Sequence, residues 1–365
     1  MTTDLRALHK EVGQSIWLDN LSRTLIHDDV LRKYISADGI SGVTSNPSIF
    51  QKAIHSSPYY QDDLRQAAES AERLYEQLVL QDLQMACDLL QPVHQESAGD
   101  DGWVSWEESP RLAHDEAATV AEARRLRGLV QRDNLLIKVP ATPQGIAALA
   151  TLIGEGISVN VTLMFGLEHV HQVFAAYQQG LAHWVKQGGD PRRVKAVASL
   201  FLSRVDTLVD QQLEKIATAE SLALRGKAAV AMAKVAYKVY QETFHGDGFA
   251  ELAKAGGRPQ YLLWASTSTK NPEYSDLLYV EPLMGPETIN TLPDETLNKL
   301  RDHGHIANRV SEDLDAAQAV MAGLESLGIH MDSVAEQLQQ EGLAAFAKSF
   351  EEMLAEVGKA MPCGG

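Results

Sequence analysis

Cysteine is scarce in this chain. Cys87 falls within a predicted helix, and Cys363 lies two residues before the end. Two cysteines are too few for a disulfide framework or for a metal site built from cysteine. A reducing cytoplasm is therefore the simplest setting that we expect.

Long hydrophobic runs and an excess of basic residues are also missing. The opening MTTDLRALHKEVGQS lacks the apolar segment of about 7–15 residues of a secretory signal, and no stretch approaches the ~18 apolar residues of a membrane helix. With 32 basic against 49 acidic residues, the formal net charge is −17. Because such a field repels nucleic acid and acidic membranes, we expect neither as a partner. An anionic substrate would need a local basic pocket.

Short β-branched or apolar segments recur along the chain, and amphipathic stretches separate most of them. This alternation is typical of a parallel α/β sheet. The pattern predicts strands at 15–21, 40–46, 101–107, 135–141, 157–163, 195–201, 260–266 and 277–283. It predicts helices at 61–90, 112–131, 143–153, 166–185 and 205–243, and only helices after residue 293.

Eight strands interleaved with helices favour a (β/α)8 barrel with additional N-terminal and C-terminal helices. A doubly wound open sheet would give a similar pattern, but no GxGxxG motif joins a strand to a helix. The last two predicted strands are only about ten residues apart, which is short for a crossover. No linker or fixed repeat divides the chain. We therefore expect one domain over 1–365, with 294–365 as a helical extension packed on the barrel.

The polar residues of the predicted strands share one phase. Alternate strand residues face opposite sides, so these side chains point into the barrel, near the ends where barrel enzymes carry their active sites. The set is Asp19, Thr44, Asn46, Ser105, Glu107, Lys138, Ser158, Asn160, Thr162, Ser199 and Ser266. Taken singly, a strand lysine more often prevents an exposed edge strand from pairing with another chain than acts as a nucleophile. A strand Asp or Asn more often starts a turn or caps the next helix. Together they favour a functional site, because buried charges are costly unless they serve each other.

Lys138 is the centre of the predicted chemistry. In LLIKVP, apolar neighbours and proline leave little room for water, which favours the free amine that attacks a carbonyl. Schiff-base chemistry also needs groups that move protons, and Asp19 and Glu107 on other strands are the candidates. Asn46, Asn160, Thr162 and Ser199 offer neutral donors and acceptors for sugar hydroxyls and an ordered water.

Basic and hydroxyl residues follow the later strands. Arg204 lies in SLFLSRVD, and Ser266 and Lys270 lie in STSTKNP. Loops after the later barrel strands often bind phosphate, and an arginine fork suits that dianion. The alternative for Arg204 is a surface ion pair with Asp206 or Asp210.

Two other chemistries are poorly supported. None of the twelve histidines lies in a predicted strand, and His169 and His171 point to different sides of a helix, which argues against a metal aldolase. No GxSxG motif or histidine at a strand end supports Ser-His-Asp hydrolysis. We therefore expect no metal.

The chain resembles the transaldolase family. The match runs from about residue 13 to 285 and rests on WLDNLSR, GVTSNPSIF, LLIKVPATPQGIAAL, GISVNVTLMF, SLFLSRVD and LWASTSTKNP, in the family's order. Lys138 occupies the position of the family's Schiff-base lysine, in its KxPAT motif. Asp19 resembles the proton-transfer aspartate. Glu107 and Thr162 resemble the pair that holds the catalytic water.

The same motifs imply the binding residues. Asn46, Asn160 and Ser199 match substrate-contacting positions, Arg204 matches the phosphate-binding arginine, and Ser266 matches a second phosphate ligand. Shorter members have an arginine in the turn where this chain has STSTKNP, and we assign Lys270 that role. Ser268 replaces an expected glycine, and Trp106 and Glu108 are larger or more acidic than the family pattern.

The resemblance implies a reaction without cofactors. A dihydroxyacetone unit passes from sedoheptulose 7-phosphate or fructose 6-phosphate, through Lys138, to glyceraldehyde 3-phosphate or erythrose 4-phosphate, in the non-oxidative pentose phosphate pathway. The alternatives are a fructose 6-phosphate aldolase, which releases free dihydroxyacetone, and a barrel that only binds sugar phosphate. The sequence is compatible with either a monomer or a homodimer.

Overall fold

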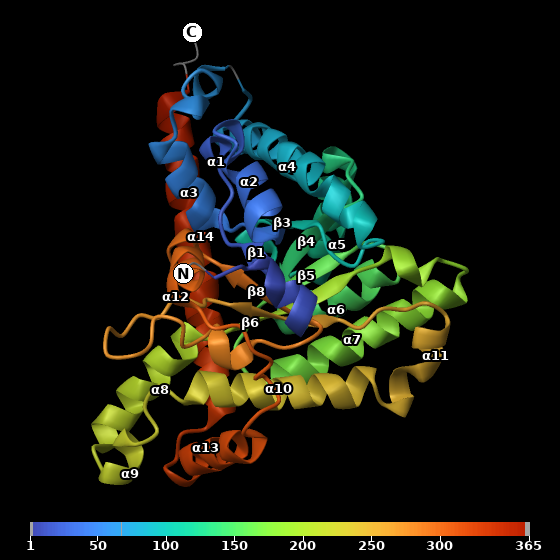
Figure 1. The fold of residues 1–365 in the computed structure, drawn as a ribbon. Helices are drawn as coiled ribbons and strands as arrows, with labels where there is room; N and C mark the ends of the chain where they lie inside the picture. Colours follow the sequence, from blue (N-terminus) through green and yellow to red (C-terminus); the bar gives the residue numbers. More distant parts are fainter. Residues whose placement is uncertain (1–2, 67, 362–365) are drawn as a thin grey trace.

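Eight parallel strands close into a barrel at the centre of the molecule (Figure 1). A computed structural model describes residues 3–66 and 68–361, and Cys363 lies outside them. Each strand pairs with its neighbours in sequence, and β8 pairs with β1. The strands are β1 (Gln14–Leu18), β2 (Ile40–Thr44), β3 (Trp103–Glu107), β4 (Leu135–Pro140), β5 (Val159–Met164), β6 (Ala196–Phe201), β7 (Tyr261–Ala265) and β8 (Thr288–Leu292). The predicted (β/α)8 barrel is confirmed.

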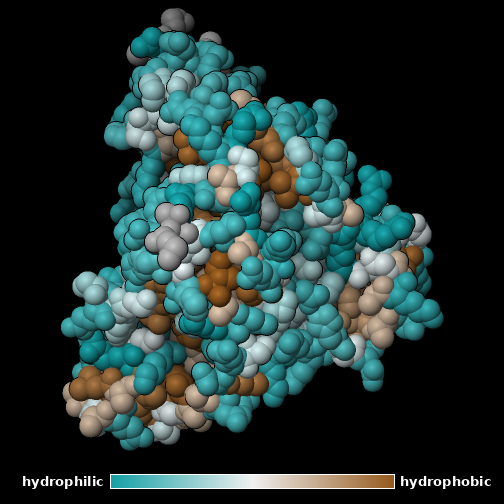
Figure 2. Space-filling model, in the orientation of Figure 1, coloured by the Kyte–Doolittle hydropathy of each residue, from teal (hydrophilic) through white to brown (hydrophobic). Residues whose placement is uncertain are grey.

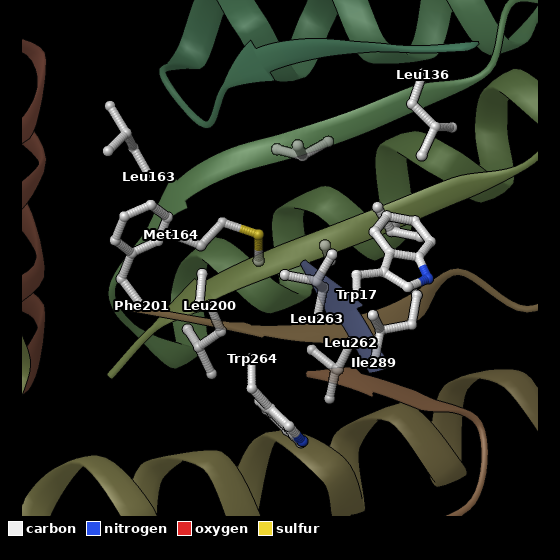
Figure 3. Close-up of a cluster of buried hydrophobic side chains, with 14 of the residues drawn as sticks. Trp17, Leu136, Leu163, Met164, Leu200, Phe201, Leu262, Leu263, Trp264 and Ile289 are labelled. Carbon is white, nitrogen blue, oxygen red and sulfur yellow. The ribbon is translucent and has the colours of Figure 1, made fainter. Parts of the chain in front are cut away.

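Large side chains fill the barrel. The Trp17 ring packs against Gly42, where a Cβ atom would lie 2.4 Å from the ring, so only glycine fits. The Trp17 indole N–H donates to the buried Asp101 carboxylate at 2.8 Å. In Figure 3, Trp17 and Leu136 lie at one end of the buried cluster, and Leu163 and Phe201 lie at the other. The second end carries the polar pocket described below.

Helices surround the barrel. They are α1 (Arg23–His27), α2 (Val30–Lys33), α3 (Pro47–Ser56), α4 (Ala71–Glu96), α5 (Glu116–Val130), α6 (Pro143–Ile153), α7 (Leu167–Lys186), α8 (Ser203–Ile216), α9 (Ala219–Leu222), α10 (Ala228–Phe244), α11 (Ala250–Lys254), α12 (Asp294–His303), α13 (Leu314–Ser326) and α14 (Met331–Ala360). A short π-helix, Leu8–Val12, precedes β1.

Two predicted helices have different bounds in the structure. The helix predicted at 61–90 begins at Ala71, because Ser70 caps its N-terminus by accepting the Arg73 N–H. The helix predicted at 205–243 is divided into α8, α9 and α10. Ala217 takes a left-handed φ of 55° and ends α8.

The eighth strand was predicted at the wrong place. Residues 277–283 form turns and a 3-10 helix, Glu281–Leu283, and the strand is Thr288–Leu292. The segment 277–283 is apolar because it packs as a buried irregular stretch, with Tyr279 only 2% exposed. A side chain satisfies part of its main chain, because the Asn290 amide of β8 donates a hydrogen bond to the Tyr279 carbonyl at 3.1 Å. The connection from β7 to β8 therefore runs from 266 to 287 and is long enough for a crossover.

The last helix runs along the whole side of the barrel. In Figure 1, α14 extends from α13 at the bottom to α3 at the top. It contacts α3, α4, α8 and β5. Polar pairs follow its contact with α3, including Ser48–Ser349 at 2.8 Å and His55–Glu356 at 2.6 Å. Residues from the end of the chain are thereby brought beside residues from its beginning.

The visible face of the molecule is mostly hydrophilic (Figure 2). In the described part of the chain, the exposed large hydrophobic side chains are Tyr59, Ile216 and Leu222. Within that same part, no helix is both long and apolar enough to cross a membrane.

Candidate active site

A pocket of about 360 Å³ lies at the carboxyl ends of the strands. It gathers side chains from most of the predicted strand motifs. Of the predicted site residues, Asp19, Thr44, Asn46, Lys138, Thr162, Ser199, Arg204, Ser266 and Lys270 line it. Glu107 and Asn160 do not line it but lie directly behind residues that do.

Lys138 and Glu107 form a buried ion pair. The two residues face each other on neighbouring parallel strands, and Lys138 Nζ lies 3.2 Å from Glu107 Oε2. Their side chains are only 6% and 7% exposed. Lys138 Nζ also donates to the Ser45 carbonyl at 3.2 Å. Burial raises the pKa of Glu107, and the charge of Lys138 opposes that rise.

Asp19 is a second carboxyl group beside the same lysine. It follows β1, and the Thr44 hydroxyl donates to its Oδ1 at 2.8 Å. Thr44 in turn accepts from Thr291 at 2.6 Å. Burial raises the pKa of Asp19, while Lys138 and the Thr44 hydrogen bond oppose the rise. Asp19 and Glu107, two carboxyl groups with raised pKa values, are thus close to the Lys138 amine. Carboxyl groups of this kind are suited to proton transfer.

Thr162 lies at an irregular strand end. The pairing of β5 with β6 shifts register between Val161 and Met164, and Leu163 takes a left-handed φ of 57°, which is strained for leucine. The Thr162 hydroxyl is buried and has no hydrogen-bond partner in the described residues. Since buried polar groups are nearly always paired, often with ordered water, this hydroxyl has a free capacity to bind water or substrate.

The predicted amides have different surroundings. Asn46 caps α3, with its side-chain oxygen accepting the Ile49 N–H at 3.0 Å, and it also lines the pocket. Asn160 is fully buried. It donates to Ser105 at 3.0 Å and accepts from Ser199 at 2.7 Å. Ser199 therefore borders the pocket, while Asn160 supports it from below.

Arg204 and Lys270 make part of the pocket lining basic. Arg204 is in the first turn of α8, where helix N–H groups also favour anions. In the described chain it forms no ion pair, and the hydroxyl groups of Tyr279 and Tyr274 donate to Asp206 and Asp210 instead. The expected alternative of a surface ion pair is therefore contradicted. Burial lowers the pKa of Arg204, although nearby carboxylates oppose this.

The hydroxyl groups next to Arg204 come from the β7–β8 connection and from α8. Ser266 has a left-handed φ of 54° and its hydroxyl lies 2.8 Å from that of Ser203. Lys270 is exposed at the rim and donates to Ser268 at 2.9 Å. Arg204, Ser266 and Lys270 are hydrogen-bond donors of the kind that bind a phosphate group.

Sequence reasoning missed several lining residues. Ser48 and Lys52 come from α3, Thr291 from β8, and Phe346 from α14. Lys52 lies on the helix that Asn46 caps, so the GVTSNPSIF motif carried a signal for it. Phe346 lies 208 residues after Lys138 in the sequence, and its ring centroid is 6.0 Å from Lys138 Nζ. No local pattern could have placed it there.

The described residues offer no cluster of side chains that would bind a metal ion. Among residues 3–66 and 68–361, no group of three or more His, Cys, Asp or Glu side chains is arranged to hold a metal ion. Cys87 is buried in α4, where burial raises the pKa of its thiol.

The fold and the pocket define a TIM barrel with a buried lysine–carboxylate centre and a basic rim. A sequence model of the transaldolase/fructose-6-phosphate aldolase family matches residues 16–357, and the chain belongs to this family.

Three similar proteins are named as transaldolases. A transaldolase of Thiobacillus denitrificans is 57% identical over 350 residues, which cover 95% of this chain and 98% of that protein. Transaldolase 1 of Streptomyces coelicolor is 45% identical, covering 97% and 94%. A transaldolase of Trichodesmium erythraeum is 42% identical, covering 94% of both.

Proposed function

We propose that this protein is a transaldolase that carries a dihydroxyacetone unit on Lys138. The donor is sedoheptulose 7-phosphate or fructose 6-phosphate, and the acceptor is glyceraldehyde 3-phosphate or erythrose 4-phosphate. One observation carries the proposal: the Lys138 amine lies 3.2 Å from the buried Glu107 carboxylate, and the pocket that Lys138 lines also contains Arg204, which forms no ion pair within the described residues. The family membership and the names of the relatives support it.

The first half-reaction builds and cleaves a Schiff base. Glu107 first takes a proton from Lys138 across their 3.2 Å contact, and the resulting free amine attacks the ketose carbonyl. The carbinolamine then loses water as Glu107 supplies that proton to the departing hydroxyl. Asp19 then takes the proton of the C4 hydroxyl. The C3–C4 bond breaks, its electron pair moves into the iminium to form an enamine, and the aldose phosphate leaves.

The second half-reaction reverses these steps on another aldehyde. The enamine carbon attacks the acceptor carbonyl, and Asp19 returns its proton to the new alkoxide. Water, held by Glu107 and Thr162, attacks the iminium and releases the new ketose. Because the iminium itself is the electron sink, the reaction needs positioning and proton transfer but no cofactor.

The remaining residues bind the sugar phosphate. Asn46, Thr44 and Ser199 contact hydroxyl groups, with Asn160 holding Ser199 in place. Arg204, Ser266 and Lys270 bind the phosphate. Phe346 gives the pocket an apolar wall, so we propose that 294–361 and the barrel act as one domain. We further propose a cytoplasmic location, because ionised phosphosugars cross membranes only at high cost.

Borohydride trapping tests the proposal. The protein is reduced in the presence of fructose 6-phosphate and mapped by peptide mass spectrometry. We expect a dihydroxyacetone-derived adduct on Lys138, none after Lys138→Ala, and none on Lys195, a buried lysine that pairs with Asp100 at 2.7 Å. A folded protein without any adduct would overturn the proposal.

An acceptor then separates transferase from lyase. With erythrose 4-phosphate, a transaldolase forms sedoheptulose 7-phosphate and little free dihydroxyacetone. Release of dihydroxyacetone at the same rate with and without the acceptor would instead identify a fructose 6-phosphate aldolase.

A further inference from the structure

A second, smaller cavity lies behind Glu107. It has a volume of about 50 Å³ and is lined by residues of α3, α4, β3, α5 and α14. Asn46 lines both this cavity and the substrate pocket. Glu107 lines the small cavity, whereas Lys138, 3.2 Å away, lines the substrate pocket. Glu107 and Asn46 therefore form the partition between the two spaces.

The lining of the small cavity has polar atoms with unused hydrogen-bonding capacity. Glu108 Oε2 and Ser109 Oγ are buried and have no hydrogen-bond partner among the described residues, whereas Glu107 Oε2 is paired with Lys138 Nζ at 3.2 Å. Buried polar atoms in proteins are nearly always satisfied, and ordered water is the usual partner when no protein group is near. A water molecule needs roughly 10–15 Å³ of such space, so the cavity has room for a short chain of waters.

The other end of the cavity reaches the surface. There its lining includes the exposed Glu72 and the acidic residues Glu76 and Glu122. Arg125 forms ion pairs with both Glu76 and Glu122, and so bridges α4 and α5 at this end. Water at this polar edge can exchange with bulk solvent.

Glu108 is a buried acidic residue that lines this cavity. Its Oε1 accepts from the Thr119 hydroxyl of α5 at 3.0 Å. Burial raises the pKa of Glu108 to about 8, against the Thr119 hydrogen bond, and the charges of Glu107 and Glu122 add to the rise. At neutral pH the side chain is then a neutral acid, which both donates and accepts hydrogen bonds and can link waters on either side.

We propose that this cavity is a water passage for the Schiff-base chemistry, with Glu108 as a positioning residue that orders the waters behind Glu107. When the carbinolamine on Lys138 loses its hydroxyl with a proton from Glu107, the water formed leaves through the passage. In the reverse step one water enters, Glu107 takes its proton, and its oxygen bonds to the iminium carbon. The substrate thus stays in the main pocket while water moves behind it. This inference rests on the proposed function.

Oxygen exchange tests the passage. Each reversible cycle of Schiff-base formation replaces the C2 carbonyl oxygen of fructose 6-phosphate with oxygen from water. The rate of ¹⁸O incorporation from H₂¹⁸O, minus the rate without enzyme, therefore reports how often water leaves the Schiff-base site and is replaced from solvent. Borohydride trapping in the same samples measures how much Schiff base is present at equilibrium.

Glu108→Leu keeps a similar volume but cannot bond to water. We expect it to slow ¹⁸O exchange about tenfold or more, with the amount of trapped adduct unchanged. Glu108→Gln, which donates and accepts like a neutral acid, should restore the exchange to within about threefold of the parent rate. Glu116→Leu, on the exposed start of α5, is the matched control and should exchange at the parent rate.

Two outcomes have different meanings. Parent-like exchange in a folded Glu108→Leu variant overturns the passage and leaves the proposed function intact. If that variant does not fold, Ser109→Val, which fills part of the cavity, takes its place with the same expectation. A parent protein that shows neither exchange nor adduct overturns the proposed function, and the passage with it.

Discussion

Gln339 in the last helix holds the main-chain carbonyl of Leu163, the strained residue that follows Thr162. Its side-chain amide donates to the Leu163 oxygen at 3.2 Å and to the Ala141 oxygen, at the end of β4, at 2.8 Å. One side chain of α14 therefore fixes the ends of β4 and β5, the strands that carry Lys138 and Thr162. The C-terminal extension is hydrogen-bonded to the ends of β4 and β5 as well as packed over them.

Gln339→Ala should reduce both stability and turnover. Two buried carbonyl groups lose a donor, which costs about 1–3 kcal/mol of the free energy of unfolding. The Leu163 bend also loses its support, so Thr162 shifts and kcat falls more than KM changes. Gln340→Ala, one position along and exposed, is the control. Urea unfolding and steady-state kinetics measure both effects, and unchanged kcat in Gln339→Ala would refute the supporting role.

Gly342 allows α14 to approach the site closely. A Cβ atom there would lie 3.0 Å from a Leu163 methyl carbon and 3.5 Å from Arg204 Nη1. Gly358, in the same helix, would meet only an Ala71 methyl at an ordinary 3.6 Å. We therefore expect Gly358→Ala to gain up to about 1 kcal/mol from helix propensity. Gly342→Ala should gain less or lose stability, and should raise KM for phosphorylated acceptors by displacing Arg204. Equal gains at both positions, with KM unchanged, would contradict this.

Much of the fold and the site was predictable because it is local. Polar residues in the inward phase of short strands identified most of the pocket, since alternation fixes the face and parallel strands share one end. The eighth strand was missed because burial and strand pairing are separate properties. LLYVEPL is apolar yet irregular, whereas TINTL pairs with β1 over its whole length despite its polar residues.

Other parts depend on contacts between distant segments. Phe346 reaches the pocket only because α14 packs along α3, and Asn160 is hidden because Ser105 and Ser199 use its amide. Strand phase predicts which side of the sheet a residue faces. It does not predict how deep in the barrel the residue lies, and therefore whether it touches substrate.

Asp206 should make stability fall as pH rises through the acidic range. Burial raises the pKa of its carboxyl from an ordinary 3.8 to about 6, although the Ala229 N–H and the Tyr279 hydroxyl oppose the rise. The folded protein thus binds this proton more tightly than the unfolded chain. The stabilisation is complete below about pH 3.8 and is lost as pH rises to about 6.

Asp206→Asn isolates this contribution. Between pH 4 and pH 7, the free energy of unfolding of the parent should fall relative to that of the variant by up to about 3 kcal/mol, since each pKa unit is worth ~1.4 kcal/mol. Urea unfolding of both proteins over this pH range gives the difference. A constant difference would mean that Asp206 titrates alike in the folded and unfolded chains.

Arg204→Ala should separate phosphorylated from unphosphorylated substrates. Loss of a charge-assisted contact worth about 1.5–3 kcal/mol predicts that KM for erythrose 4-phosphate rises roughly 10- to 100-fold. KM for erythrose, which lacks the phosphate, should not change. Equal rises for both acceptors would show that Arg204 does not bind the phosphate.

Lys52→Ala should weaken phosphosugar binding in a salt-dependent way. Lys52 is exposed on α3 at the rim of the pocket, and forms no ion pair within residues 3–66 and 68–361. On a chain with net charge −17, such a lysine raises the local concentration of an anionic substrate. We expect KM for erythrose 4-phosphate to rise about 3- to 10-fold at low salt and less at high salt, because exposed charges are screened beyond ~10 Å at 0.1 M. Lys215→Ala, exposed near the end of α8, is the control. A rise that is independent of salt would instead indicate a direct, desolvated contact between Lys52 and the substrate.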